Sequence, residues 1–187
     1  MDASSPARPG RFRPDQYDFQ EGDALFFDTN IWLFLLDPFG DPSDSRIVAY
    51  SAAYKRILKA RCALFTDDTV VGEFINRALK LGHEADIRHG LADPSWKRYR
   101  TSDEFGYSLE RTTALANELL SACQLLHADP DWPQILSDMK QRQRDLNDEI
   151  LVRICQHHDL ILVTDDGDFT QADLDIISAN SAFFRRR

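Results

Sequence analysis

Short, continuously apolar runs that each lead into an acidic residue constrain the fold of this chain most. The clearest are Ala24 to Asp28, Ala63 to Thr66 and Leu160 to Thr164, with a shorter run from Leu174 to Ile177. An apolar run without alternation is typical of a strand covered on both faces, as in a parallel sheet. Helical patterns separate these runs. The sequence therefore predicts an α/β fold with a parallel sheet.

The helices between these strands are predicted from apolar residues that recur every three or four positions. Their ranges are 29–36, 45–60, 67–81, 105–126, 135–143 and 147–157. We expect residues 1–20 to form a flexible N-terminal arm and residues 21–187 to form a single domain. Within that domain, residues 85–140 are expected to form a longer, mainly helical segment, and residues 180–187 a basic tail.

The composition indicates a soluble, cytoplasmic protein without a membrane partner. No apolar run is long enough to span a bilayer, and the first twenty residues lack the apolar core of a signal peptide. The three scattered cysteines are typical of reduced thiols. The net charge of −9 argues mildly against a broad nucleic-acid-binding surface. Carboxylates that hold a metal ion would themselves account for several of these charges.

Four acidic residues stand where a predicted strand ends or a predicted helix begins. They are Asp28, Glu73, Asp148 and Asp166. Carboxylates at the carboxyl ends of parallel strands face the crevice in which open α/β sheets bind ligands. Several carboxylates in one crevice repel each other unless a cation neutralises them, and hard oxygen ligands suit Mg²⁺ or Mn²⁺. This pattern predicts a metal-dependent phosphodiesterase.

The order and context of these residues resemble a known family. An apolar strand ends in Asp28-Thr29-Asn30, Glu73 lies early in a helix, and Asp148 stands sixteen residues before Thr164 in the run Leu162 to Phe169. This succession resembles the PIN domain, and within it the bacterial VapC-type toxins of toxin–antitoxin pairs. The resemblance implies a three-layer PIN-like fold, a central mostly parallel sheet flanked by helices. The helical segment would then be an insertion between the second and third acidic motifs.

The resemblance also implies an activity, a cofactor and partners. The activity is that of an endoribonuclease with one or two Mg²⁺ or Mn²⁺ ions, and the partners are RNA, a small antitoxin protein and a second copy of the chain. Asp28, Asp148 and Asp166 would be the principal metal ligands, and Glu73 an outer-sphere partner. Asp168 is a secondary metal candidate, whereas Asn30 and Thr164 match polar positions that orient carboxylates, water or phosphate.

Two further groups of residues are candidates for RNA contact. Trp96, Lys97 and Arg98 interleave an aromatic ring with basic side chains, a pattern that can stack bases and contact phosphates. A solvated helix start explains the same pattern equally well. Arg142 and Arg144 precede the Asp148 helix and could flank an RNA path, or could simply belong to a charged solvent face.

Two other classes of function stay open at this point. A PIN scaffold could hold RNA or a protein partner without cutting, although all four acidic positions are present. Response-regulator and haloacid-dehalogenase-like folds also place an Asp after their first strand. The Asp-x-Asp-x-Thr pattern of the latter is missing, because residues 28–32 read Asp-Thr-Asn-Ile-Trp.

Overall fold

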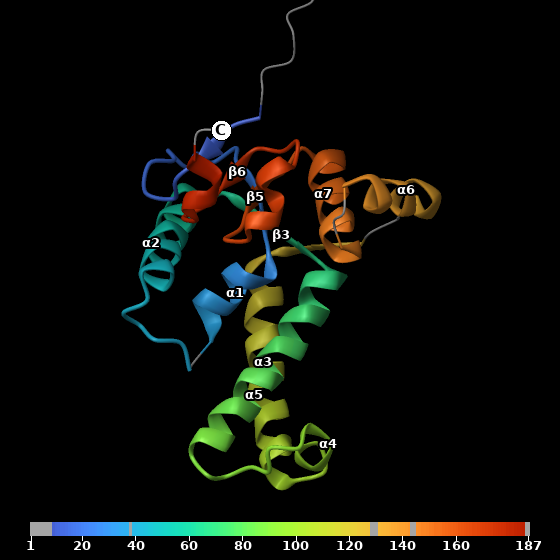
Figure 1. The fold of residues 1–187 in the computed structure, drawn as a ribbon. Helices are drawn as coiled ribbons and strands as arrows, with labels where there is room; N and C mark the ends of the chain where they lie inside the picture. The colour runs from blue at the N-terminus through green and yellow to red at the C-terminus, as the bar shows by residue number, and fades with distance from the viewer. Residues whose placement is uncertain (1–8, 38, 128–130, 143–144, 186–187) are drawn as a thin grey trace, which may run out of the picture.

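A parallel sheet at the centre of the fold fixes where the acidic residues meet (Figure 1). The computed structural model describes residues 9–37, 39–127, 131–142 and 145–185. In this part of the chain the strand order is β1-β6-β5-β2-β3-β4, and every pairing is parallel. The strands are β1 Arg11–Phe12, β2 Ala24–Phe27, β3 Ala63–Asp67, β4 Gln124–Leu126, β5 Ile161–Val163 and β6 Ile176–Ile177. The predicted α/β class with a parallel sheet is confirmed.

Helices flank this sheet, and two of them extend well beyond it (Figure 1). The α-helices are α1 Thr29–Leu36, α2 Ser45–Ala60, α3 Asp68–Arg88, α4 Trp96–Tyr99, α5 Asp103–Ala122, α6 Trp132–Arg142 and α7 Leu146–His158. Two 3₁₀ helices follow, η1 Gly167–Gln171 and η2 Ser181–Phe184. Helices α3 and α5 run side by side away from the sheet, with α4 at their far end. Within the described residues, no helix combines the length and the apolar character that crossing a bilayer requires.

The core forms around the two central strands. Leu25, Phe26 and Phe27 of β2 and Leu162 and Val163 of β5 are all at most 1% exposed. Burying a side chain of this size contributes about 1.5–3 kcal/mol. Both faces of these strands are covered, as the apolar runs without alternating polar residues predict.

Polar residues at the strand ends begin the helices that follow. The side chain of Asp28 accepts a hydrogen bond from the Thr29 N–H at the start of α1, and Asp67 accepts one from the Val70 N–H at the start of α3. Such caps satisfy backbone donors that the helix leaves without partners. The chain therefore turns from strand to helix directly at the edge of the sheet that carries the acidic residues.

The predicted helix over residues 105–126 is wrong at its end. Helix α5 stops at Ala122, Cys123 is extended, and Gln124–Leu126 form β4, which pairs with β3. The apolar spacing of Cys123 and Leu126 continues the helical pattern by coincidence, and pairing with the edge of β3 overrides it. The residues from His83 to Arg100, which look irregular in sequence, instead contain the last turns of α3 and all of α4.

The N-terminal segment also differs from the expected flexible arm. Arg11–Phe12 form β1, which pairs with β6 at the edge of the sheet. The guanidinium of Arg11 donates hydrogen bonds to the carbonyl oxygens of Leu174 and Ala172, and Phe19 is buried in the core. A two-residue strand has no periodicity from which it could be predicted. Residues 1–8 of the predicted arm, and residues 186–187 of the predicted tail, lie outside the described residues.

Candidate metal centre

Asp28 and Asp166 come together because their strands are neighbours. Phe27 and Val163 are paired in register at the carboxyl ends of β2 and β5, and the backbone N–H of Asp28 donates to the carbonyl oxygen of Val163. Asp166 lies three residues beyond Val163 and caps η1 by accepting a hydrogen bond from the Asp168 N–H. The topology therefore places both carboxylates at one edge of the sheet.

Asp28 is buried and strongly hydrogen-bonded. Its side chain accepts from the Thr29 N–H at 2.6 Å, from the Thr164 hydroxyl at 2.6 Å and from the Asn30 amide. Burial, together with the smaller effects of the Glu73 and Asp166 charges, raises the pKa of Asp28 to about 6, although the bonds from Thr164 and Thr29 act in the opposite direction. The residue is thus held in place by donors, while burial and the neighbouring carboxylates disfavour its charged form.

Asn30 and Thr164 link Asp28 to the loop that carries Asp166. Besides its bond to Asp28, the side-chain amide nitrogen of Asn30 donates to the Thr164 hydroxyl. The side-chain oxygen Oδ1 of Asn30 accepts from the Asp165 N–H at 3.0 Å. The Thr164 hydroxyl also accepts from the Asp166 N–H at 3.0 Å. These two side chains therefore hold the backbone of residues 164–166 in place relative to Asp28 and orient the Asp28 carboxylate.

Asp148 lies in the first turn of α7, facing the same group of carboxylates. Asp145, not Asp148, is the N-cap of this helix, and it accepts a hydrogen bond from the Asp148 N–H. Burial raises the pKa of Asp148 to about 7, with further contributions from the charges of Asp145, Asp166, Asp28 and Asp168. The charges of Asp166, Asp28 and Asp168 all act on the Asp148 carboxyl, so Asp148 belongs to the same acidic neighbourhood.

Glu73 joins the group from α3. Its carboxylate accepts a hydrogen bond from the Thr29 hydroxyl at 3.1 Å, and the Arg77 guanidinium lies 3.4 Å from its other oxygen. Glu73 is also one of the charges that raise the pKa of Asp28. The four acidic residues of the sequence pattern are therefore brought to one edge of the sheet from β2, α3, α7 and the loop after β5.

The side chains present suit a hard divalent cation. All of them offer carboxylate oxygens, which Mg²⁺ and Mn²⁺ prefer, and a bound cation would favour the charged forms of Asp28 and Asp148, whose pKa values are raised. Among the described residues, no three His, Cys, Asp or Glu side chains already stand in an arrangement that could hold a metal ion.

The predicted RNA-contact residues are not brought to this edge. Trp96 packs against His83, Tyr99 and Phe105 toward the far end of α3 and α5, and His83 lies about 15 Å along α3 from Glu73. Arg98 forms an ion pair with Asp93 at 2.8 Å, and Lys97 is exposed. Arg142 ends α6, but nothing is described of its side chain, and Arg144 lies outside the described residues.

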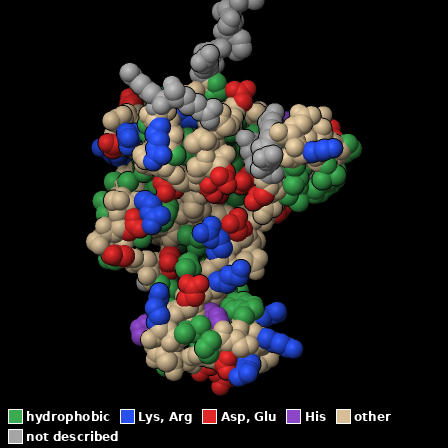
Figure 2. Space-filling model, in the orientation of Figure 1, with side chains coloured by type: hydrophobic (Ala, Val, Ile, Leu, Met, Phe, Trp, Pro, Cys, Tyr) green, Lys and Arg blue, Asp and Glu red, His purple; other side chains and the backbone are tan. Residues whose placement is uncertain are grey.

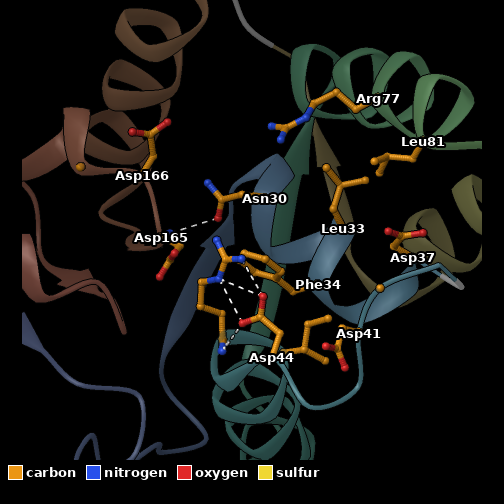
Figure 3. A pocket seen from close by; sticks show the side chains of 14 residues that line it. Asn30, Leu33, Phe34, Asp37, Asp41, Asp44, Arg77, Leu81, Asp165 and Asp166 are labelled. Carbon is orange, nitrogen blue, oxygen red and sulfur yellow. Dashed lines mark hydrogen bonds and ion pairs between the residues drawn. The ribbon is translucent and has the colours of Figure 1, made fainter. Parts of the chain in front are cut away.

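A pocket that sequence reasoning missed adjoins the acidic group. It measures about 540 Å³ and is bounded by α1, the loop before α2, α3 and the loop after β5 (Figure 3). Asn30, Asp165 and Asp166 form the wall shared with the acidic group, while Arg46 and Arg77 bring positive charge. Arg77 follows Glu73 by four residues, so helical spacing could have indicated it. Arg46 carries no comparable signal. Figure 2 shows acidic side chains gathered at the centre of this face, with Lys and Arg side chains close by.

Comparison with known families agrees with this geometry. Residues 25–174, well over half of the chain, match the PIN domain family. The chain therefore belongs to the PIN domain family. No curated protein sequence matches it.

Solved structures with the same fold are toxin PIN domains of the VapC and FitB types. VapBC2 from Rickettsia felis, solved bound to a DNA fragment from their promoter, is similar with a TM-score of 0.54 and 14% identity, over 83% of this chain and 98% of that one. FitAcB from Neisseria gonorrhoeae is similar with a TM-score of 0.51 and 20% identity, over 82% of this chain and 96% of that one. At this level of identity, the likeness establishes a shared fold.

Proposed function

We propose that this protein is a metal-dependent endoribonuclease that hydrolyses RNA phosphodiester bonds with Mg²⁺ or Mn²⁺. The observation that carries the proposal is the convergence of Asp28, Asp148 and Asp166 at one sheet edge, with the pKa values of two of them raised by burial and by each other's charge. Members of the PIN family are typically nucleases and typically bind Mg²⁺, which agrees with this donor set.

Each residue has a distinct part in the proposed reaction. Asp28, Asp148 and Asp166 would hold the cation, with Asp168 beside them, and Glu73 would act from the outer sphere. A bound divalent cation lowers the pKa of a coordinated water and neutralises charge on the phosphate. Thr164 and Asn30 keep the Asp28 carboxylate oriented toward the site through the bonds described above. The exposed side of the group, formed by Asp166 and Asp168, is where a phosphate and a water can enter.

The proposal is tested by incubating the purified protein with a mixture of structured and single-stranded RNAs in Mg²⁺, Mn²⁺ or EDTA. Asp166→Ala is the informative variant because Asp166 is exposed and its loss should leave the core intact. Asp15→Ala, which removes an exposed aspartate that is not one of the proposed site residues, is the matched control. We expect metal-dependent cleavage by the wild type and by Asp15→Ala, and none by Asp166→Ala. Cleavage that survives Asp166→Ala or EDTA would refute the assignment.

We also propose that the protein is the toxin of a toxin–antitoxin pair and is held by a small antitoxin protein. Its support is the shared fold with VapBC2 and FitAcB. Induced expression of the wild type should arrest bacterial growth, and co-expression of a small neighbouring gene should restore it and yield a complex that co-purifies. Growth unaffected by an active wild-type nuclease would count against the toxin role.

Size-exclusion chromatography with light scattering would test the expected homodimer. RNA binding without any cleavage would favour the non-cleaving PIN scaffold instead.

A further inference from the structure

Two groups contact the Arg46 guanidinium at the edge of the pocket. Its guanidinium lies over the Phe34 ring, 5.1 Å from the ring centre. The Asp44 carboxylate binds its edge, with Nε 3.1 Å from Oδ1 and Nη2 2.6 Å from Oδ2. Phe34 in turn stacks on the buried ring of Tyr50 at an interplanar angle of 4°. An arginine side chain ordinarily samples many conformations, and these contacts favour the one in which the guanidinium lies beside the Phe34 ring.

The outward face of this guanidinium is open to a ligand. The Phe34 ring lies on one side of the guanidinium, while the Arg46 side chain is 53% exposed and lines the pocket. Leu33, Ile47 and Leu81 add apolar surface to the same pocket. A planar, partly apolar group of the size of a nucleobase fits such a site, because unpaired RNA bases stack on guanidinium planes and aromatic rings.

The charges around the pocket are compatible with a nucleotide despite its several aspartates. Asp44 is neutralised by Arg46, and the Asp165 carboxylate accepts a hydrogen bond from the Tyr50 hydroxyl. Asp37 and Asp41 accept hydrogen bonds from backbone N–H groups of their own loop. Arg77 is 50% exposed, and its guanidinium points toward the space between Asn30 and Asp166 in Figure 3, where a phosphate beside the metal centre would lie.

We propose that Arg46 is a stacking platform for one base of the substrate RNA, next to the phosphate held at the acidic group, and that Arg77 contacts the backbone of that nucleotide. This inference rests on the proposed ribonuclease function. It assigns RNA contact to the pocket between α1, α2 and α3 and not to the distant Trp96 group. Because stacking on a guanidinium tolerates any base, the platform positions the strand without selecting its sequence.

The test is a double-mutant cycle that reads binding and not cleavage. Fluorescence anisotropy gives the Kd of the tightest-binding single-stranded RNA from the mixture, with Ca²⁺ replacing Mg²⁺ so that the strand stays intact. Each nucleotide of the RNA is replaced in turn by an abasic residue, and each RNA is measured with wild type and with Arg46→Lys. This variant keeps the positive charge but loses the planar group. Lys59→Ala, an exposed cation on the same helix but outside the pocket, is the matched control. Thermal melts confirm that each variant is folded.

We expect one abasic position to weaken wild-type binding by roughly 10-fold, an effect that disappears in Arg46→Lys and persists in Lys59→Ala. An abasic effect that is equally large in Arg46→Lys would overturn the inference. If RNA is cleaved in a metal-dependent manner but no position couples to Arg46, the inference fails and the proposed function stands. If no RNA binds or is cleaved, both fail. Binding of a basic peptide to this pocket in place of RNA would also overturn it.

Discussion

Replacing Asp148 by Asn should stabilise the metal-free protein at alkaline pH. Asn has nearly the same shape but no charge, and within the described residues no hydrogen bond to the Asp148 side chain would be lost. The pKa of Asp148 is about 7 in the fold, against an ordinary value of 3.8. Ionising this group in the folded state therefore costs up to about 4 kcal/mol, and about 1–2 kcal/mol once solvent screening of a half-exposed group is allowed for.

The direction of the pH dependence follows from the raised pKa. Between about pH 4 and pH 7 the folded protein binds a proton at Asp148 that the unfolded chain has already released. Wild-type stability therefore falls as pH rises through this window, and the deficit is complete above pH 7. The advantage of Asp148→Asn should accordingly grow from pH 5 to pH 8, where it reaches about 2–8 °C in Tm for a chain of this size.

Thermal melts followed by circular dichroism, in EDTA at several values between pH 5 and pH 8, measure this effect. Asp15→Asn provides the matched control, because it removes an exposed aspartate that is not among the charges acting on Asp148 and should leave Tm unchanged within about 1 °C. A Tm difference between Asp148→Asn and wild type that stays constant with pH would show that neither burial nor the neighbouring carboxylates raise the pKa of Asp148. The geometry described for the centre would then be wrong.

Three other perturbations have definite expected outcomes. Saturating Mg²⁺ should raise the wild-type Tm at pH 8, by the equivalent of about 2.7 kcal/mol at a hundredfold excess over Kd. Differential scanning fluorimetry should show little effect of Mg²⁺ on Asp166→Ala. Tyr50→Phe should cost about 1–3 kcal/mol in urea unfolding, because the buried Tyr50 hydroxyl accepts from the Ala179 N–H and donates to the loop after β5; an unchanged unfolding midpoint would contradict this. Trp96→Ala should cost about 2 kcal/mol by the same assay, since Trp96 packs at the tip of α3 and α5, and should leave the RNA affinity of the folded protein unchanged. A loss of affinity at unchanged stability would instead support RNA contact at Trp96.

The central part of the fold could be predicted because each signal in it is local. The apolar runs at β2 and β5 are buried on both faces, and that at β3 is buried on one face and partly covered on the other, so composition alone marks them as strands. Asp67 could be identified as a helix cap because it directly follows such a run and precedes a helical pattern. Helix α2 has the predicted bounds, since loop residues precede it and an apolar stripe runs through it.

The remaining features depend on contacts that are distant in the sequence. Strands β1 and β4 are two and three residues long and exist only because β6 and β3 offer free edges. The pocket beside the acidic group joins Phe34 and Arg46 to Arg77 and Asp165, which no spacing rule connects. Tyr50 looks like one more apolar position of α2, yet its hydroxyl bonds to Asp165, to the Thr164 carbonyl and to the Ala179 N–H. These contacts become visible only once the sheet order is known.

The supports of the three proposed metal ligands differ in stiffness, and this difference bears on how a cation would bind. Asp28 follows a fully buried strand and receives three hydrogen bonds, so moving it would disturb close-packed core. Asp148 stands in the first turn of a helix without such bonds to its side chain in the described structure, and Asp166 lies on an exposed loop. For the proposed metal centre we therefore expect Asp28 to supply the most firmly held oxygen, and Asp148 and Asp166 to adjust their positions when a cation binds.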